Sequence, residues 1–103
     1  MMFEPLVVLA TIQVREGKVV RKSDGVRYEP GTGTVVFPNP ENLNVVPVVS
    51  SASTTGLAED YATELHYLRE VVGKNEFRVW KRALAIGGRD APPTDFTAIV
   101  VGL

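Results

Sequence analysis

The sequence has few of the residues that catalytic and metal sites need. It contains no cysteine, which excludes disulfide bonds and thiolate metal sites, and its one histidine is His66. A catalytic triad would have to be built around that imidazole, and no Gly-x-Ser-x-Gly sequence occurs. Glu59, Asp60 and Glu64 lie close enough for acid–base work, but a solvent-facing turn shows the same spacing. We expect no catalytic residue, metal or cofactor, and a chain that is not an enzyme.

An excess of charge of one sign is also lacking. Eleven Lys and Arg residues against twelve Asp and Glu residues give a net charge of −1. The densest basic group is Arg78, Lys81 and Arg82, with Arg89 nearby, and it is typical of solvated strand and loop faces. This balance predicts no nucleic-acid partner, because such proteins need a positive surface.

There is no long apolar run of the kind that crosses a membrane. The mean hydropathy of +0.06 is that of an ordinary globular protein. Residues 6–14 are apolar enough to suggest a signal peptide, but Glu4 and Pro5 stand where such a peptide carries positive charge. We expect neither a signal peptide nor a membrane partner.

The spacing of turn-forming residues predicts one β domain over residues 1–103. Turn signals recur about every eight to twelve residues, as in sandwiches and barrels. Asp24-Gly25 is a hairpin signal, because glycine supplies the positive φ of the turn. Pro47 argues that its strand begins near Val48. The strands expected cover residues 6–14, 18–22, 26–29, 34–37, 48–51, 77–80 and 96–101.

Residues 57–72 fit two structures. Apolar residues recur there at helical spacing, and Gly73 could end a helix. Residues 65–72, followed by Gly73-Lys74-Asn75-Glu76, also fit a strand and a turn, which we favour. A short helix around residues 57–68 is the alternative.

Two places attract attention as functional sites. On a strand, Trp80 shares a face with Arg78 and Arg82, and indole beside guanidinium suits a ligand platform or a subunit interface. A core tryptophan is the competing interpretation. The strand at residues 96–101 is apolar on both faces and therefore needs cover on both sides. Ile99, Val100, Val101 and Leu103 are the predicted oligomer interface.

The second half of the chain resembles the H-type lectin domain. The resemblance covers about residues 34–103 and is carried by four short motifs. In order, they are Val35-Val36-Phe37, Val46-Pro47-Val48-Val49-Ser50, Glu76-Phe77-Arg78-Val79-Trp80 and Phe96-Thr97-Ala98-Ile99-Val100-Val101-Gly102. Glu76 stands where the family has glycine, and the tryptophan of the family's last strand is replaced within Thr97-Ala98-Ile99. No sugar-binding residue is carried over.

The resemblance implies an antiparallel sandwich that assembles as a trimer. With the pattern of short runs, it leads us to expect a mostly β sandwich of six to eight strands. Such domains occur as sugar-binding lectins and in bacteriophage tail and virion proteins. The function expected is a structural virion protein, a capsid decoration or tail component made in the host cytoplasm, with other virion proteins as partners. The alternative is a carbohydrate-binding module with a glycan at Trp80, Arg78 and Arg82, and a general protein-interaction domain is a third possibility.

Overall fold

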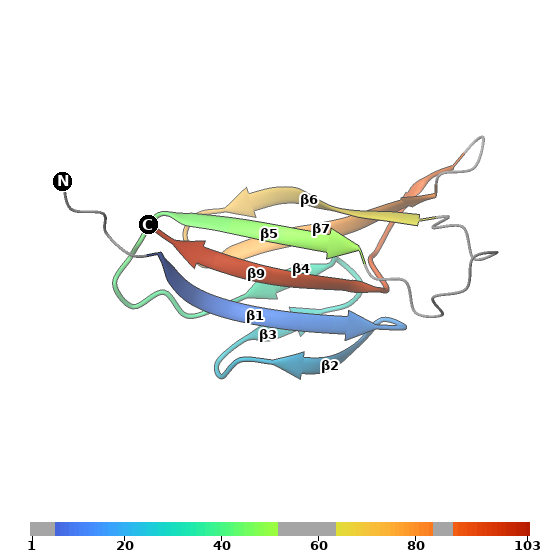
Figure 1. Cartoon of the computed structure of the whole chain (residues 1–103). Helices are drawn as coiled ribbons and strands as arrows, with labels where there is room; N and C mark the ends of the chain where they lie inside the picture. The colour runs from blue at the N-terminus through green and yellow to red at the C-terminus, as the bar shows by residue number, and fades with distance from the viewer. Residues whose placement is uncertain (1–5, 52–63, 84–87) are drawn as a thin grey trace.

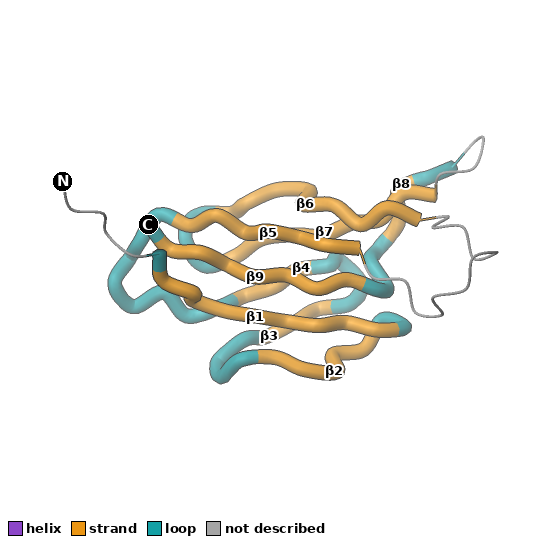
Figure 2. The backbone as a smooth tube through the Cα atoms, viewed as in Figure 1, coloured by secondary structure: helices purple, strands orange, loops and turns teal. Residues whose placement is uncertain are grey.

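A computed structural model describes residues 6–51, 64–83 and 88–103, and every regular element in these ranges is a β-strand (Figures 1 and 2). Their bounds are β1 Val7–Arg15, β2 Lys18–Lys22, β3 Arg27–Glu29, β4 Thr34–Val36, β5 Val45–Ser51, β6 Glu64–Val72, β7 Glu76–Ala83, β8 Asp90–Ala91 and β9 Phe96–Gly102. The described ranges contain no helix long and apolar enough to cross a membrane.

The strands form two antiparallel sheets packed face to face. Sheet A has the order β2-β1-β9-β5. Sheet B has the order β3-β4-β7-β6, with the two-residue β8 paired to β7. Figure 1 shows sheet A in front of sheet B. The predicted mostly β sandwich is confirmed, with nine strands in the described residues where six to eight were expected.

Alternation along each strand places the core between the sheets. In β9, Phe96, Ala98 and Val100 point inward and are at most 1% exposed, whereas the residues between them point outward. In this strand, as in the central part of β1, every second residue therefore belongs to the core, whereas the edge strand β2 is exposed throughout. The buried hydrophobic residues are Ala10, Ile12, Val14, Val26, Val35, Phe37, Phe77, Val79, Phe96, Ala98 and Val100.

Three details of the strand prediction change. Residues 64–72 form β6, so the strand interpretation is confirmed and the helix is wrong there, while residues 57–63 lie outside the described residues. β5 begins at Val45 and contains Pro47, against the predicted start near Val48. Sheet A ends at β5, where a strand tolerates a residue without an N–H. The turn at Asp24-Gly25 does not close a hairpin, because it leads from β2 in sheet A to β3 in sheet B.

The β3–β4 turn depends on Gly33. Its φ is +66°, and a Cβ atom there would collide with the carbonyl oxygen of Val79 and the ring of Pro93. The Val79 amide donates a hydrogen bond to the Gly33 carbonyl at 2.9 Å, which holds this turn against β7. Only glycine combines this backbone conformation with so close an approach.

Candidate functional site

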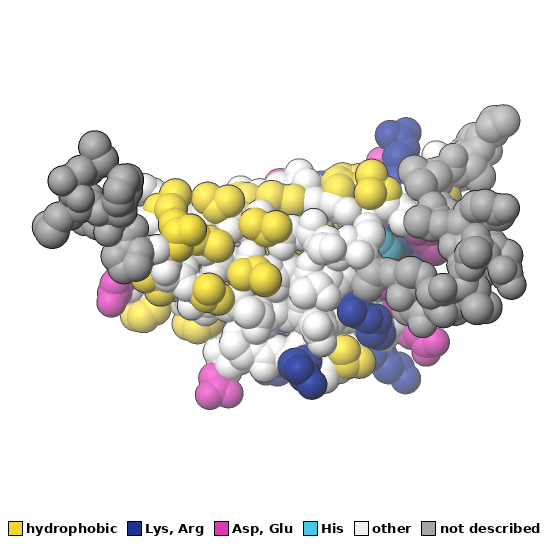
Figure 3. Space-filling view, in the orientation of Figure 1, with side chains coloured by type: hydrophobic (Ala, Val, Ile, Leu, Met, Phe, Trp, Pro, Cys, Tyr) yellow, Lys and Arg dark blue, Asp and Glu magenta, His cyan; other side chains and the backbone are white. Residues whose placement is uncertain are grey.

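The outer face of sheet A carries a cluster of exposed apolar side chains. Val46 of β5 pairs with Val101 of β9, which pairs with Val8 of β1, and Val48 pairs with Ile99. The exposed fractions are 61% for Val8, 53% for Val48, 45% for Val46 and 40% for Ile99. Figure 3 looks onto this face and shows hydrophobic side chains gathered toward the C-terminal end of β9. We call these five residues the apolar patch.

The predicted oligomer interface is only partly on this face. Ile99 and Val101 point outward and belong to the patch, and Leu103, just beyond β9, is 58% exposed. Val100 is wrongly placed in the prediction, because it points into the core and is 1% exposed. A sequence that is apolar at every position from 98 to 101 does not say which residues face inward.

Sequence reasoning missed the contribution of β5 to the patch. Val46 and Val48 flank the buried Pro47, so they share the outer face of the sheet. The alternation was visible in the sequence, but Pro47 had been taken as a residue before the paired strand. Because Pro47 was placed outside the strand, Val46 and Val48 were not recognised as an outward-facing pair.

The outer face of sheet B differs, because its long side chains contact one another. Trp80, Arg78 and Arg82 share this face, as predicted. The guanidinium of Arg69 lies 4.4 Å from the centre of the Trp80 ring, so one side of the indole is already covered. The indole Nε1 is buried without a hydrogen-bond partner.

The two arginines beside Trp80 also have partners within the protein. Arg78 Nη1 lies 2.7 Å from Glu70 Oε1, and Arg78 Nη2 lies 3.6 Å from Glu76 Oε2. Arg82 Nε lies 3.8 Å from Asp90 Oδ1. The predicted ligand platform is therefore assembled in space, but its charges are largely satisfied by neighbouring carboxylates.

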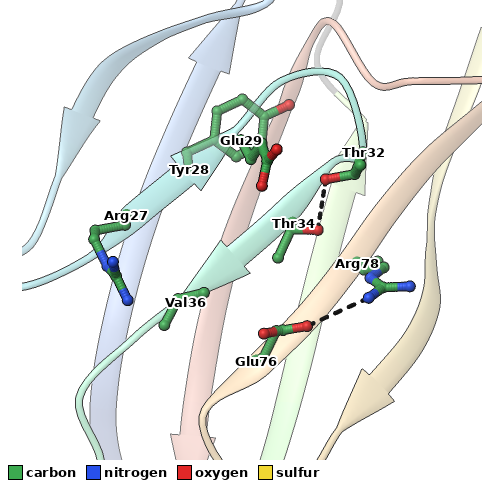
Figure 4. Close-up of a pocket in the computed structure, with 8 residues that line it drawn as sticks. All are labelled: Arg27, Tyr28, Glu29, Thr32, Thr34, Val36, Glu76 and Arg78. Atoms are coloured by element: carbon green, nitrogen blue, oxygen red, sulfur yellow. Dashed lines mark hydrogen bonds and ion pairs between the residues drawn. The ribbon is translucent and has the colours of Figure 1, made fainter.

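A groove of about 600 Å³ runs along β4 beside this cluster (Figure 4). Thr34 and Val36 of β4 lie between the longer side chains of β3 on one side and of β7 on the other. The lining residues are Arg27, Tyr28, Glu29, Thr32, Thr34, Val36, Glu76 and Arg78. They offer both signs of charge and threonine hydroxyls, so the groove suits a polar ligand and does not select for one charge.

His66 is buried in sheet B, with 5% of its surface exposed. Its Nε2 accepts hydrogen bonds from the backbone amides of Thr94 at 3.1 Å and Asp95 at 3.0 Å. Desolvation lowers the pKa of His66 below 6.5, against the opposing effect of the carboxylates of Asp95 and Glu64. The imidazole is therefore neutral at pH 7, with its proton on Nδ1.

The histidine does not form a nucleophile–base pair within the described part of the chain. Ser51 Oγ accepts a hydrogen bond from the backbone amide of His66 at 2.6 Å and does not contact its imidazole. The Nε2 that a catalytic base would use is occupied by the two amides. Across residues 6–51, 64–83 and 88–103, no three His, Asp or Glu side chains are grouped as metal ligands.

Comparison of the chain with models of protein families, with curated proteins and with solved structures finds no match. The candidate surfaces must therefore be judged on their own geometry.

Proposed function

We propose that this chain is a structural protein that acts by assembling into a homo-oligomer through the apolar patch. The observation that carries this proposal is the register of β5, β9 and β1, which places Val46, Val101 and Val8 in one row and Val48 beside Ile99 in the next. Exposed hydrophobic residues scattered singly need no explanation, but a contiguous group marks an interaction surface.

Burial of the patch would contribute several kcal/mol toward association. Complete burial of an exposed valine or isoleucine side chain contributes roughly 1.5–3 kcal/mol. Part of this burial has already occurred in the monomer, because Val8, Val46, Val48 and Ile99 are only 40–61% exposed. Burial of what is left contributes about 1 kcal/mol for each residue. A second copy presenting the same patch would double the number of buried side chains, against the entropy cost of association.

The biological setting that we propose is a bacteriophage virion, in which the protein is a capsid decoration or a tail component. The support is the resemblance of residues 34–103 to H-type lectin-like domains, which implies a trimer and occurs in virion proteins. Other virion proteins would be its partners, and the protein would reach the virion from the host cytoplasm. Assembly through a sheet face suits such a role, because it needs no catalytic group.

The proposal is tested with two matched valines on the edge strands of sheet A. Val48 of β5 is 53% exposed and lies in the patch, whereas Val20 of β2 is 58% exposed and lies outside it. We expect Val48→Asp to weaken assembly by about 100-fold, because a carboxylate would be buried in an apolar contact. Val20→Asp should leave the oligomer intact.

The measurement is the solution mass by light scattering over a wide range of protein concentrations. A trimer, or another closed oligomer, that only Val48→Asp dissociates supports the proposal. A wild-type chain that is monomeric at every concentration contradicts it. Equal effects of the two substitutions would also contradict it, because the patch would then have no special role.

A carbohydrate-binding module is the alternative proposal, and the groove along β4 favours it. Threonine hydroxyls, carboxylates and guanidinium groups together can hydrogen-bond to sugar hydroxyls. The Trp80 site is less suitable, because Arg69 occupies one side of the indole. A glycan array on the wild-type chain and on Arg27→Ala tests this alternative. A sugar that binds only the wild-type chain would place the lectin function first.

A further inference from the structure

His66 joins the two sheets at one end of the sandwich. Its imidazole lies on β6 in sheet B and holds the amides of Thr94 and Asp95, which lead directly into β9 of sheet A. The same two residues hold the β1–β2 turn, because the Glu16 amide donates to Asp95 Oδ1 at 3.0 Å and the Gly17 amide donates to the Thr94 carbonyl at 2.9 Å. Residues 94–95 are therefore fastened to both sheets.

The ring of His66 is enclosed on its other sides as well. It stacks on Phe96, with ring centres 6.3 Å apart, and its Nδ1 is buried without a hydrogen-bond partner. Among the described residues, the charged groups facing the ring are Asp95 before β9, Glu64 on β6 and Lys81 on β7. Lys81 Nζ is itself 2.6 Å from Glu64 Oε2, and β5 contributes no titratable residue.

We propose that His66 is an acid-sensitive clasp, in which uptake of one proton at Nε2 ends its two hydrogen bonds to Thr94 and Asp95. Sheet B then holds the segment that enters β9 more weakly, through the Lys81 Nζ hydrogen bond to Thr94 Oγ1 at 3.2 Å. Protonated Nε2 becomes a donor facing two donors, so both contacts turn from attractive to repulsive. Because residues 94–95 lead into β9, which carries Ile99 and Val101, we expect this weaker hold to loosen the entry of β9 and, through it, to weaken assembly in acid. This last step rests on the proposed function, whereas the clasp itself does not.

The direction of the pH effect follows from the lowered pKa of His66. Because the unfolded chain binds this proton more readily than the folded chain, the stabilising contribution is complete above pH 6.5 and is lost as the pH falls toward the pKa of the folded state. The folding equilibrium constant falls about tenfold for each pH unit that separates the two pKa values. Carboxylates titrate mainly below about pH 5, so comparing about pH 7.5 with about pH 5.5 isolates the histidine.

The clasp is tested by nuclear magnetic resonance on the wild-type chain. Since His66 is the only histidine, every imidazole signal belongs to it, and the couplings of each ring nitrogen to the two carbon-bound ring protons distinguish Nδ1 from Nε2. We expect the proton on Nδ1 at about pH 7.5, and a titration below pH 6.5 that the Thr94 and Asp95 amides follow. A proton on Nε2 at neutral pH, or amides that do not respond to the titration, would overturn the proposal.

His66→Gln is the matched variant, because a glutamine amide oxygen can accept the same hydrogen bonds without titrating near neutral pH. We expect its solution mass to stay constant over the pH range in which the wild-type His66 ring titrates, whereas the wild-type oligomer dissociates over that range. Equal dissociation of both chains would overturn the link between the clasp and assembly. A wild-type chain that is monomeric at neutral pH would contradict the proposed function alone, and the ring-nitrogen titration still decides the clasp. If His66→Gln does not fold, the same titration of the wild-type chain still tests the clasp.

Discussion

The outer faces of the two sheets occupy equivalent positions in the sandwich and differ in chemistry, although β6 of sheet B also exposes Leu65 and Val72. The apolar patch on sheet A consists of branched side chains. Four of its five residues are 40–61% exposed, namely Val8, Val46, Val48 and Ile99. On sheet B, Arg78 is paired with Glu70 and Glu76, and Arg69 lies on Trp80. The four ion pairs found among the described residues all lie in sheet B. On sheet B most charged groups are paired within the protein, although Trp80 Nε1 and Arg78 Nε have no partner, whereas the patch on sheet A has no partner of any kind among the described residues.

This difference indicates that the two faces of a small domain can have different roles. A polar side chain on a sheet face can find a partner on the neighbouring strand, so such a face is complete in the monomer. Two neighbouring valines form no such polar pair. Their exposed surface is stabilised only when another apolar surface removes it from water. The face that is least complete in the monomer is therefore the one that we assign to assembly.

The largest effect is expected for a charge at the centre of the patch. Val101 lies between Val46 and Val8 in the register of sheet A. Val101→Asp should weaken assembly by roughly 4 kcal/mol, or about 1,000-fold, because the carboxylate would lose its hydration without gaining a partner. Sedimentation velocity would measure the oligomer, with Arg82→Ala on the outer face of sheet B as the control. A similar loss in both variants would remove the distinction between the two faces.

A smaller but substantial effect is expected at Gly33, on the sheet B side. Gly33→Ala should lower the free energy of unfolding by about 2–3 kcal/mol, since the added Cβ combines a strained positive φ with a collision against the Val79 carbonyl. Chemical denaturation measures this change. Gly31→Ala is the matched control, because a Cβ at Gly31 meets no atom within 4 Å. Equal losses would show that the close approach at Gly33 has no energetic consequence.

The contact of Arg69 with Trp80 should contribute less. Arg69→Ala should lower the free energy of unfolding by about 0.5–1 kcal/mol, through the lost cation–π contact. Because Trp80 is the only tryptophan, its fluorescence reports exposure of the indole directly. An unchanged emission spectrum would mean that Arg69 does not cover the ring in solution. The oligomer on the sheet A side should be unaffected.

The smallest effect is expected for the exposed ion pair. Glu70→Gln should cost no more than about 0.5 kcal/mol, because the Arg78 and Glu70 side chains are 38% and 45% exposed and solvent screens their attraction. High salt should reduce this difference further, whereas it should not weaken assembly through the apolar patch. Unfolding curves and light scattering at low and high salt give the comparison. Assembly that dissociates in salt would point to an ionic interface in place of an apolar one.

Much of the sandwich could be predicted from local pattern, and the exceptions have identifiable causes. Alternation around Ile12 and Val14 was sufficient for β1, whereas the turn before Phe77 favoured the β6–β7 hairpin but left a helix open as the alternative. The start of β5 was misplaced, because a proline is tolerated in an edge strand and sequence does not say which strands are edges. The turn at Asp24-Gly25 was recognised, but a turn signal does not specify which sheet receives the next strand.

The candidate surfaces were predictable to a lesser degree. The shared face of Trp80 and Arg78 follows from the two-residue period alone, whereas the covering of the indole by Arg69 depends on the pairing of β6 with β7, in which Arg69 lies at a register shift. The role of His66 gave no local signal, since its hydrogen-bond partners lie 28 and 29 residues further along the chain.

The sequence by itself determined a mostly β domain of short strands joined by turns, because alternation and turn residues act over a few neighbouring positions. Only the tertiary structure decided which apolar residues of the last strand are core and which are surface. Val100 and Val101 are the same amino acid, and pairing with β1 and β5 turns one toward sheet B and the other toward solvent. That choice depends on strand register, which is set by contacts between segments far apart in the chain.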